Sequence, residues 1–246
     1  MYSNKKCLII YSGQSRFLNT SIRLHSLATE KFSDMQFDVM LSTWQEDTSE
    51  KDIQALNEWK HGETYIRLPM HNDWADYNPK VKVFNGMKML LSKSIALNYL
   101  LDLPNNYDFI ILTRTDYHVP CITQEDFSFY NRVYKNTSKN MTSVFDGQYC
   151  WKMTSWELLV NDNFVVMPAS LVYNIDKTTI TNITTDILEE AYEHDLQSGH
   201  IFMFKFLTSL HNISDTSYRI KFDELVSTPQ LFRSSSEIEQ FCNKYI

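Results

Sequence analysis

Residues 7–16 read CLIIYSGQSR, a run of apolar residues that passes into a short polar loop with one of the chain's 5 glycines. A continuous apolar run is typical of a strand that is buried on both faces of a sheet. Similar runs occur at 37–41 (FDVML) and 107–112 (YDFIIL), and helical patterns follow the first run at about 18–32 and precede the last at about 83–101. This alternation of buried strands and amphipathic helices predicts an α/β fold.

The patterns elsewhere are weaker, and no repeat or linker divides the chain, so we expect a single domain over residues 1–246. Further strands are expected at 63–68, 163–167 and 218–222, further helices at 184–193 and 200–210, and a helical turn at 156–159. Between the second and third strands the sequence is charged and predicts a mobile connection. The segment 71–79, which contains Trp74 and Tyr77, is expected to be a loop with exposed aromatic side chains.

The composition excludes several classes of protein. Lys and Arg number 23 and Asp and Glu 30, so the formal charge of −7 disfavours binding to nucleic acid or to anionic membranes. Hydrophobic residues make up 43% of the 246 residues, enough for a sizeable core and too much for a disordered chain. The 4 cysteines have no C-x-x-C spacing, so we expect buried free thiols rather than a disulfide framework or a zinc site. We find no signal sequence and no apolar run of about 20 residues, which predicts a cytoplasmic protein without a transmembrane segment.

Unusual side chains stand at the ends of three expected strands, where open α/β sheets bind their ligands. Gly13 allows close approach of the backbone to a ligand, and Trp44 can stack on a base or line its pocket. Arg16 and Arg114 can each donate two hydrogen bonds to a diphosphate. Asp116 can hold a divalent metal through its carboxylate. Together these residues predict a site for a nucleoside diphosphate.

The three segments also resemble a known family. They read LIIYSGQSR at 8–16, FDVMLSTW at 37–44 and YDFIILTRTD at 107–116. In this order they are similar to the G-Q-x-R loop, the second strand and the R-x-D motif of GT-A-type glycosyltransferases of surface-polysaccharide synthesis in bacteria and some large viruses. The resemblance covers about residues 5–120. It implies a GT-A-like, Rossmann-type mixed sheet flanked by helices, a nucleotide-sugar donor with UDP favoured, and Mn²⁺ or Mg²⁺ as cofactor. A viral source would place the protein in the host cytoplasm.

The resemblance also implies roles for individual residues. Asp116 aligns with the last Asp of the D-x-D element of GT-A proteins, the expected metal contact and a catalytic residue. Arg114 stands where that element has its first Asp, so its charge can replace part of the metal's charge and make the metal dispensable. The loop after the first strand is expected to hold the nucleotide through Gly13, Gln14, Ser15 and Arg16.

Residues 1–120 are accordingly expected to bind the donor and residues 121–246 the acceptor. Asp162, which directly precedes an apolar run, is the candidate for the base that deprotonates the acceptor hydroxyl or for a contact with the acceptor, and Glu157 lies nearby in sequence. A role for Asp162 as a turn or cap carboxylate is the alternative. His194 and His200 are minor candidates for a metal ligand. The sequence does not distinguish inversion from retention of the sugar's configuration.

The function predicted from these features is a hexosyl- or pentosyltransferase that moves a sugar from a nucleotide-diphosphate donor to a glycan acceptor in surface-polysaccharide or glycoprotein-glycan synthesis. One alternative is a sugar nucleotidyltransferase, for which the loop at 13–16 has too few glycines. The other is a non-catalytic nucleotide-sugar-binding module, which remains open because the segment 114–116 (RTD) has a single carboxylate, that of Asp116. Lys88 and Lys93, on the helix before the third apolar run, are expected to be solvated.

Overall fold

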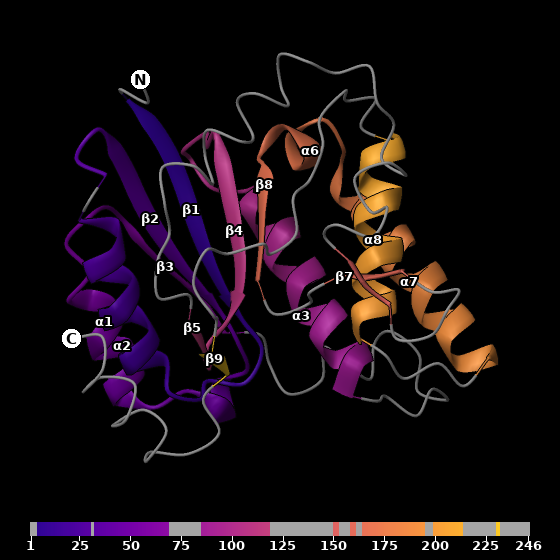
Figure 1. The fold of residues 1–246 in the computed structure, drawn as a ribbon, viewed down its shortest axis with the longest axis horizontal. Coiled ribbons are helices and arrows are strands. Elements are labelled where there is room, and N and C mark those ends of the chain that lie inside the picture. The colour runs from indigo at the N-terminus through magenta and orange to yellow at the C-terminus, as the bar shows by residue number, and fades with distance from the viewer. Residues whose placement is uncertain are drawn as a thin grey trace.

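A mixed five-stranded sheet forms the centre of the protein (Figure 1). This computed structural model describes residues 4–30, 32–68, 85–118, 150–152, 158–160, 164–194, 199–213 and 230–231. The strands of the sheet are β1 (Lys5–Ser12), β2 (Met35–Ser42), β3 (Thr64–Arg67), β4 (Phe109–Arg114) and β8 (Phe164–Pro168). They lie in the order β3-β2-β1-β4-β8; the first four are parallel, and β8 is antiparallel to β4.

Alternation of side chains along β1 explains why residues 7–11 of this strand are apolar without interruption. Leu8 and Ile10 belong to the core on one face of the sheet, and Cys7, Ile9 and Tyr11 belong to the core on the other. All five are fully buried. Both faces of the sheet are therefore covered, and a strand at its centre has no position for a solvated side chain.

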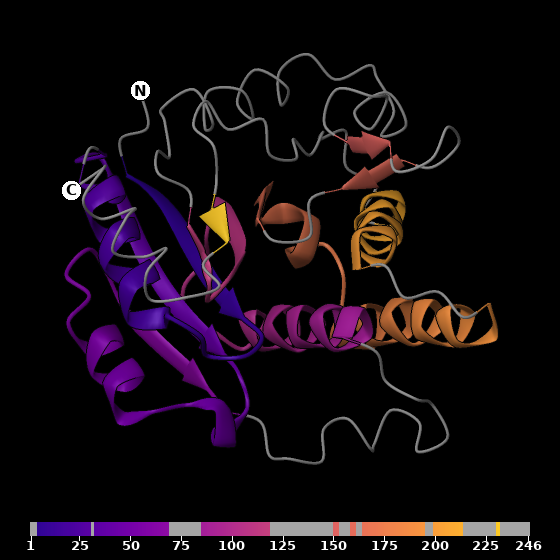
Figure 2. The same ribbon diagram turned by 60° about the horizontal axis from the view of Figure 1, so that its bottom comes forward.

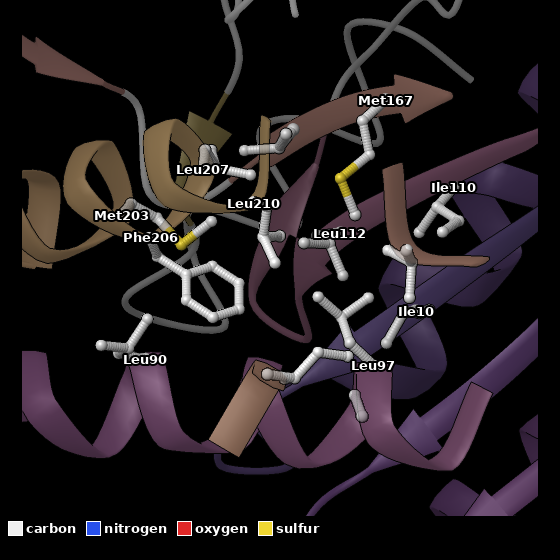
Figure 3. Packing of buried hydrophobic residues seen from close by; sticks show 14 of the residues in the cluster. Ile10, Leu90, Leu97, Ile110, Leu112, Met167, Met203, Phe206, Leu207 and Leu210 are labelled. Carbon is white, nitrogen blue, oxygen red and sulfur yellow. The ribbon is translucent and has the colours of Figure 1, made fainter. Parts of the chain in front are cut away.

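Helices cover the two faces in two groups (Figures 1 and 2). One face carries α1 (Leu18–Thr29) and α2 (Glu50–Asn57), and the other carries α3 (Asn85–Leu100), α7 (Lys177–Glu193) and α8 (Gly199–Ile213). Figure 3 shows Ile10, Leu112 and Met167 of the sheet in the second core with Leu97 of α3 and Phe206 of α8. The predicted α/β fold, with a mixed sheet flanked by helices in a single domain, is confirmed. Since β8, α7 and α8 belong to this core, the parts of the chain before and after residue 120 share it.

The prediction of a mobile connection between the second and third strands is wrong, because α2 lies there. Ser49 caps this helix: its hydroxyl accepts from the backbone N–H of Asp52, and the Asp52 carboxylate accepts from the Ser49 backbone N–H at 3.0 Å. The spacing of Ser49 and Asp52 is that of a capping box, so the sequence does contain the signal for this helix.

The second half of the chain departs from the sequence prediction in two places. The expected helical turn at 156–159 is wrong where the structure describes it, since β7 (Leu158–Val160) pairs there with β6 (Cys150–Lys152). The helix α7 begins at Lys177 instead of 184, with Asp176 accepting a hydrogen bond from the Thr179 backbone N–H at 2.7 Å. Its first turns are rich in threonine, which has a low helix propensity and hides the helix in the sequence.

The shorter elements are β5 (Tyr117–His118), which pairs with β9 (Gln230–Leu231), α6 (Ser170–Tyr173) and a 3₁₀ helix at Gln45–Asp47. The predicted strand at 218–222 and loop at 71–79 lie outside the described residues. Along the ranges that the structure describes, no helix is long and apolar enough to cross a membrane.

The order of the strands places a binding crevice at one edge of the sheet. From β1 the chain proceeds outward to β2 and β3, and then returns to form β4 on the opposite side of β1. Parallel strands whose connections diverge in this way leave a crevice beyond their carboxyl ends. In the register of the sheet, Ser12 at the end of β1 lies between Ser42 of β2 and Arg114 of β4. The three segments singled out in the sequence therefore end side by side.

Candidate functional site

A cavity of about 430 Å³ opens at this edge of the sheet. It is lined by the ends of β1, β2 and β4 and by the start of α3. The lining residues are Ser12, Gly13, Gln14, Arg16, Trp44, Asp47, Lys88, Met89, Arg114, Thr115 and Asp116. The structure thus brings the predicted site residues together: of those that it describes, only Ser15 is not part of this lining.

The loop after β1 bends at Gly13, whose φ of +99° lies in the region that glycine adopts far more readily than other residues. The Gly13 backbone N–H donates to the carbonyl of Ser42 at 3.2 Å, which holds the loop against the end of β2. A Cβ atom at Gly13 would meet no other atom within 4 Å, so conformation and not crowding requires the glycine here. Beyond the bend, Gln14 and Arg16 are exposed and available to a ligand.

Thr115 joins the loop after β1 to the loop after β4. Its hydroxyl donates to the Gln14 carbonyl and accepts from the Arg16 backbone N–H at 3.1 Å. Its own carbonyl accepts from the Ser21 hydroxyl at 2.7 Å. Thr115 is buried, so these hydrogen bonds are shielded from water. Sequence reasoning missed this residue, although its place between Arg114 and Asp116 puts it at the same strand end.

Arg114 and Asp116 form a two-pronged ion pair. The Nε of Arg114 donates to Oδ1 of Asp116, and Nη2 donates to Oδ2, both at 2.7 Å. The Asp116 side chain is 6% exposed, whereas that of Arg114 keeps 32% of its surface exposed. Both oxygens of the predicted metal ligand are therefore occupied by a cation of the chain itself.

The described residues of the cavity do not form a donor set that fits a divalent metal. A metal site of this kind needs several hard oxygen ligands and concentrated negative charge. The acidic residues in the described part of the lining are Asp47 and Asp116, and a guanidinium spans the second. Nowhere in the described ranges do three His, Cys, Asp or Glu side chains gather as a metal site would need. His194, a minor candidate for a metal ligand, is exposed at the end of α7 and is not part of the lining. The side chain of His200, the other minor candidate, is not among those that the structure describes.

Trp44 and Ser15 are placed differently from what the sequence suggests. Trp44 is 4% exposed and forms part of the cavity wall, so it presents only a small part of its ring to a ligand. The hydroxyl of Ser15 is buried and has no hydrogen-bond partner among the described residues. Ser15 therefore supports the loop from inside, and its neighbours Gln14 and Arg16 face outward.

The prediction that Lys93 is solvated is wrong. Its side chain is fully buried, and its ammonium group donates to the Ser12 hydroxyl at 3.2 Å. Ser12 in turn donates to the Thr113 carbonyl at 3.4 Å and lines the cavity, so the Nζ atom of Lys93 lies directly behind the end of β1. Lys88, one and a half turns earlier on α3, is exposed as predicted and lines the cavity itself.

The core beneath the site is held by neutral groups. The Tyr11 hydroxyl and Nδ1 of His25 are 2.6 Å apart and fully buried. Burial lowers the pKa of His25 to about 4 and raises the pKa of Tyr11, so both are neutral at pH 7. Cys7, on the same strand, is a free buried thiol as predicted, and burial raises its pKa as well. These residues support β1 and do not take part in the cavity.

Asp162 and Glu157 lie outside the described residues, as do Trp74 and Tyr77. Asp162 lies between two described strands: Val160 ends β7, and Phe164 begins β8 and pairs with Thr113 near the end of β4. The antiparallel strand β8 therefore starts at the edge of the sheet that carries the cavity.

No protein-family model and no curated protein matches the chain. Among solved structures, it is similar to the galactosyltransferase LgtC in complex with donor and acceptor sugar analogues, with 12% identity and a TM-score of 0.49 over 83% of this chain and 70% of that chain. Mouse xyloside xylosyltransferase 1 has 11% identity and a TM-score of 0.41 over 89% and 85% of the two chains. The bifunctional glycosyltransferase WbbM has 10% identity and a TM-score of 0.43 over 92% and 39%. All three are glycosyltransferases, but at these scores the similarity assigns no activity to this chain.

Proposed function

We propose that the protein is a glycosyltransferase that uses a nucleoside-diphosphate sugar as its donor. One observation carries the proposal: the Gly13 loop, Trp44 and Arg114, which come from three separate strands, line a single cavity at the switch point of the sheet. Their order along the chain is that of the glycosyltransferase motifs which the sequence resembles. A volume of about 430 Å³ lies in the range of small-molecule sites.

The charges of the cavity suit the chemistry of sugar transfer. When the bond between the sugar and the diphosphate breaks, negative charge develops on the leaving phosphate oxygen, and fixed cations stabilise it. Arg16, Lys88 and Arg114 line the cavity, and Lys93 stands behind Ser12. We assign the diphosphate to these cations and the nucleoside to the wall that includes Trp44.

The acceptor and the base remain part of the proposal. We assign the acceptor glycan to residues 121–246 and the transfer of its hydroxyl proton to Asp162, which precedes β8 by two residues. The transferred group is a hexose or a pentose, with UDP favoured as carrier, and the product belongs to surface-polysaccharide or glycoprotein-glycan synthesis in the cytoplasm. An Asp162→Asn variant that still binds the donor and has lost transfer would support the role of this residue.

A thermal-shift screen with UDP, GDP, dTDP and CMP tests the proposal. A ligand at 100 times its dissociation constant adds about 2.7 kcal/mol to the free energy of unfolding. We expect one nucleotide to give such a shift, and we expect Arg16→Ala to weaken its binding by about 10-fold to 100-fold, the usual range for a lost charge-assisted hydrogen bond. The matched control is Arg23→Ala, since Arg23 is exposed on α1 and does not line the cavity.

Turnover separates the enzyme from a binding module. Incubation with the sugar esters of the nucleotide that binds should release the free nucleoside diphosphate, by transfer to an added glycan or by slow transfer to water. Binding without any release would favour the non-catalytic module. The absence of a shift with every nucleotide would contradict the donor site itself.

A further inference from the structure

We propose that the cavity binds the diphosphate without a divalent metal, and that Asp116 serves to fix Arg114 instead of holding a metal ion. This inference rests on the proposed function, because it concerns how the same site binds its donor. It assigns to Arg114 the charge that a metal would otherwise supply, and it makes Asp116 a positioning residue.

The ion pair with Asp116 fixes the position of the Arg114 guanidinium. A carboxylate that accepts from Nε and Nη2 of one guanidinium fixes the plane of that group as well as its position. Asp116 is held in turn by its place in the buried turn after β4, next to Thr115. The Arg114 side chain remains 32% exposed and lines the cavity. The result is a guanidinium held at the ligand space by a nearly buried anion.

The charges that line the cavity favour a diphosphate over a divalent cation. Among the residues that the structure describes, three cationic side chains and two carboxylates line the cavity, and Arg114 already neutralises one of those carboxylates. Behind Ser12, the buried Nζ of Lys93 adds a further hydrogen-bond donor. A divalent cation next to Arg114 would be repelled by the guanidinium, whereas a diphosphate would be attracted by all of these cations.

Arg114 is also preorganised for the leaving diphosphate. A cation that is already in place when negative charge develops stabilises the transition state without any cost of reorganisation. The hydrogen bonds of Thr115 tie the loop after β4 to Gln14 and to the backbone of Arg16, so the backbone segments that carry Arg114 and Arg16 are joined directly. Arg114 therefore meets the leaving diphosphate in a fixed position, as a bound metal would.

Calorimetric titration of the full chain with UDP, GDP and dTDP tests the inference. Each titration is made in excess EDTA and again in Mn²⁺ or Mg²⁺. We expect one nucleotide to bind in EDTA with a dissociation constant within about 3-fold of its value with metal. A loss of more than about 10-fold in EDTA would overturn the inference and leave the proposed function standing. Failure of every nucleotide under both conditions would overturn both.

Two variants add a readout that does not depend on catalysis. Arg114→Met should weaken binding in EDTA by about 10-fold to 100-fold, and Arg114→Lys should restore part of it, because lysine keeps the charge but cannot form the two-pronged contact. Arg23→Met is the control for loss of a surface cation. If Arg114→Met binds the nucleotide in EDTA as tightly as the wild type, the inference is wrong. Should that variant fail to fold, the EDTA comparison on the wild-type chain still decides.

Discussion

Replacement of Asp116 by asparagine should lower the stability of the protein and not only its activity. The carboxylate accepts two hydrogen bonds from Arg114 at 2.7 Å and is 6% exposed. An asparagine at this position keeps one acceptor oxygen but turns an N–H₂ group toward a guanidinium that itself only donates. The variant therefore loses one hydrogen bond and the whole attraction between opposite charges.

The size of the effect follows from the burial of the pair. Exposed ion pairs contribute about 0–1 kcal/mol, and removal of one partner from a fully buried pair costs about 3–5 kcal/mol. Since Asp116 is nearly buried and Arg114 is one-third exposed, we expect an intermediate loss of about 2 kcal/mol. For a chain of this length, that loss corresponds to a decrease in Tm of about 4–8 °C.

Urea denaturation followed by circular dichroism measures the loss, with Asp102→Asn as the matched control. Asp102 pairs with Lys177, but both side chains are about half exposed, so its replacement should cost less than about 0.5 kcal/mol. A double-mutant cycle with Arg114→Met should give a coupling energy of about 1–2 kcal/mol. If Asp116→Asn costs no more than the control, the pair is not formed as described and Arg114 is not fixed.

Three further predictions concern the site and the core beneath it. Lys93→Met removes the ammonium group behind Ser12 and should weaken nucleotide binding by about 10-fold, measured by calorimetry; unchanged affinity would make Lys93 a purely structural residue. Gly13→Ala places a side chain at a φ of +99° and should lower the free energy of unfolding by about 1–2 kcal/mol, and a stability equal to that of the wild type would refute the conformation of the loop. The free energy of unfolding should fall by up to about 3 kcal/mol between pH 6.5 and 4, because unfolded His25 binds a proton below pH 6.5 and folded His25 only below about 4. A His25→Gln variant should lack this part of the pH dependence, and an equal slope in both proteins would contradict the buried neutral histidine.

The sequence predicts the sheet well because its strands are buried on both faces. Such strands are apolar without interruption, as at 7–11 and 109–112, and they stand out against polar loops. The residues that follow them then meet at one edge by the geometry of parallel strands alone. For this reason the sequence predicts one common site for Gly13, Arg16 and Arg114.

Contacts between segments that are distant in sequence could not be predicted in the same way. Lys93 looks like a solvated lysine because the sequence does not show that this position on α3 faces the end of β1. The pairing of Arg114 with Asp116, by contrast, has a signal: the two residues are only two apart in sequence, and the turn after β4 brings their opposite charges together. Opposite charges at that spacing should be considered as a pair before either is assigned to a ligand.

A crystal structure of the protein with the tightest-binding nucleoside diphosphate tests the central claim most directly. We predict that the diphosphate lies between the Gly13 loop and Arg114, with phosphate oxygens within hydrogen-bond distance of the guanidinium, and that the nucleoside lies along the wall that includes Trp44. A nucleotide bound elsewhere on the molecule, with this cavity filled only by water, would contradict the assignment of the site and with it the proposed function.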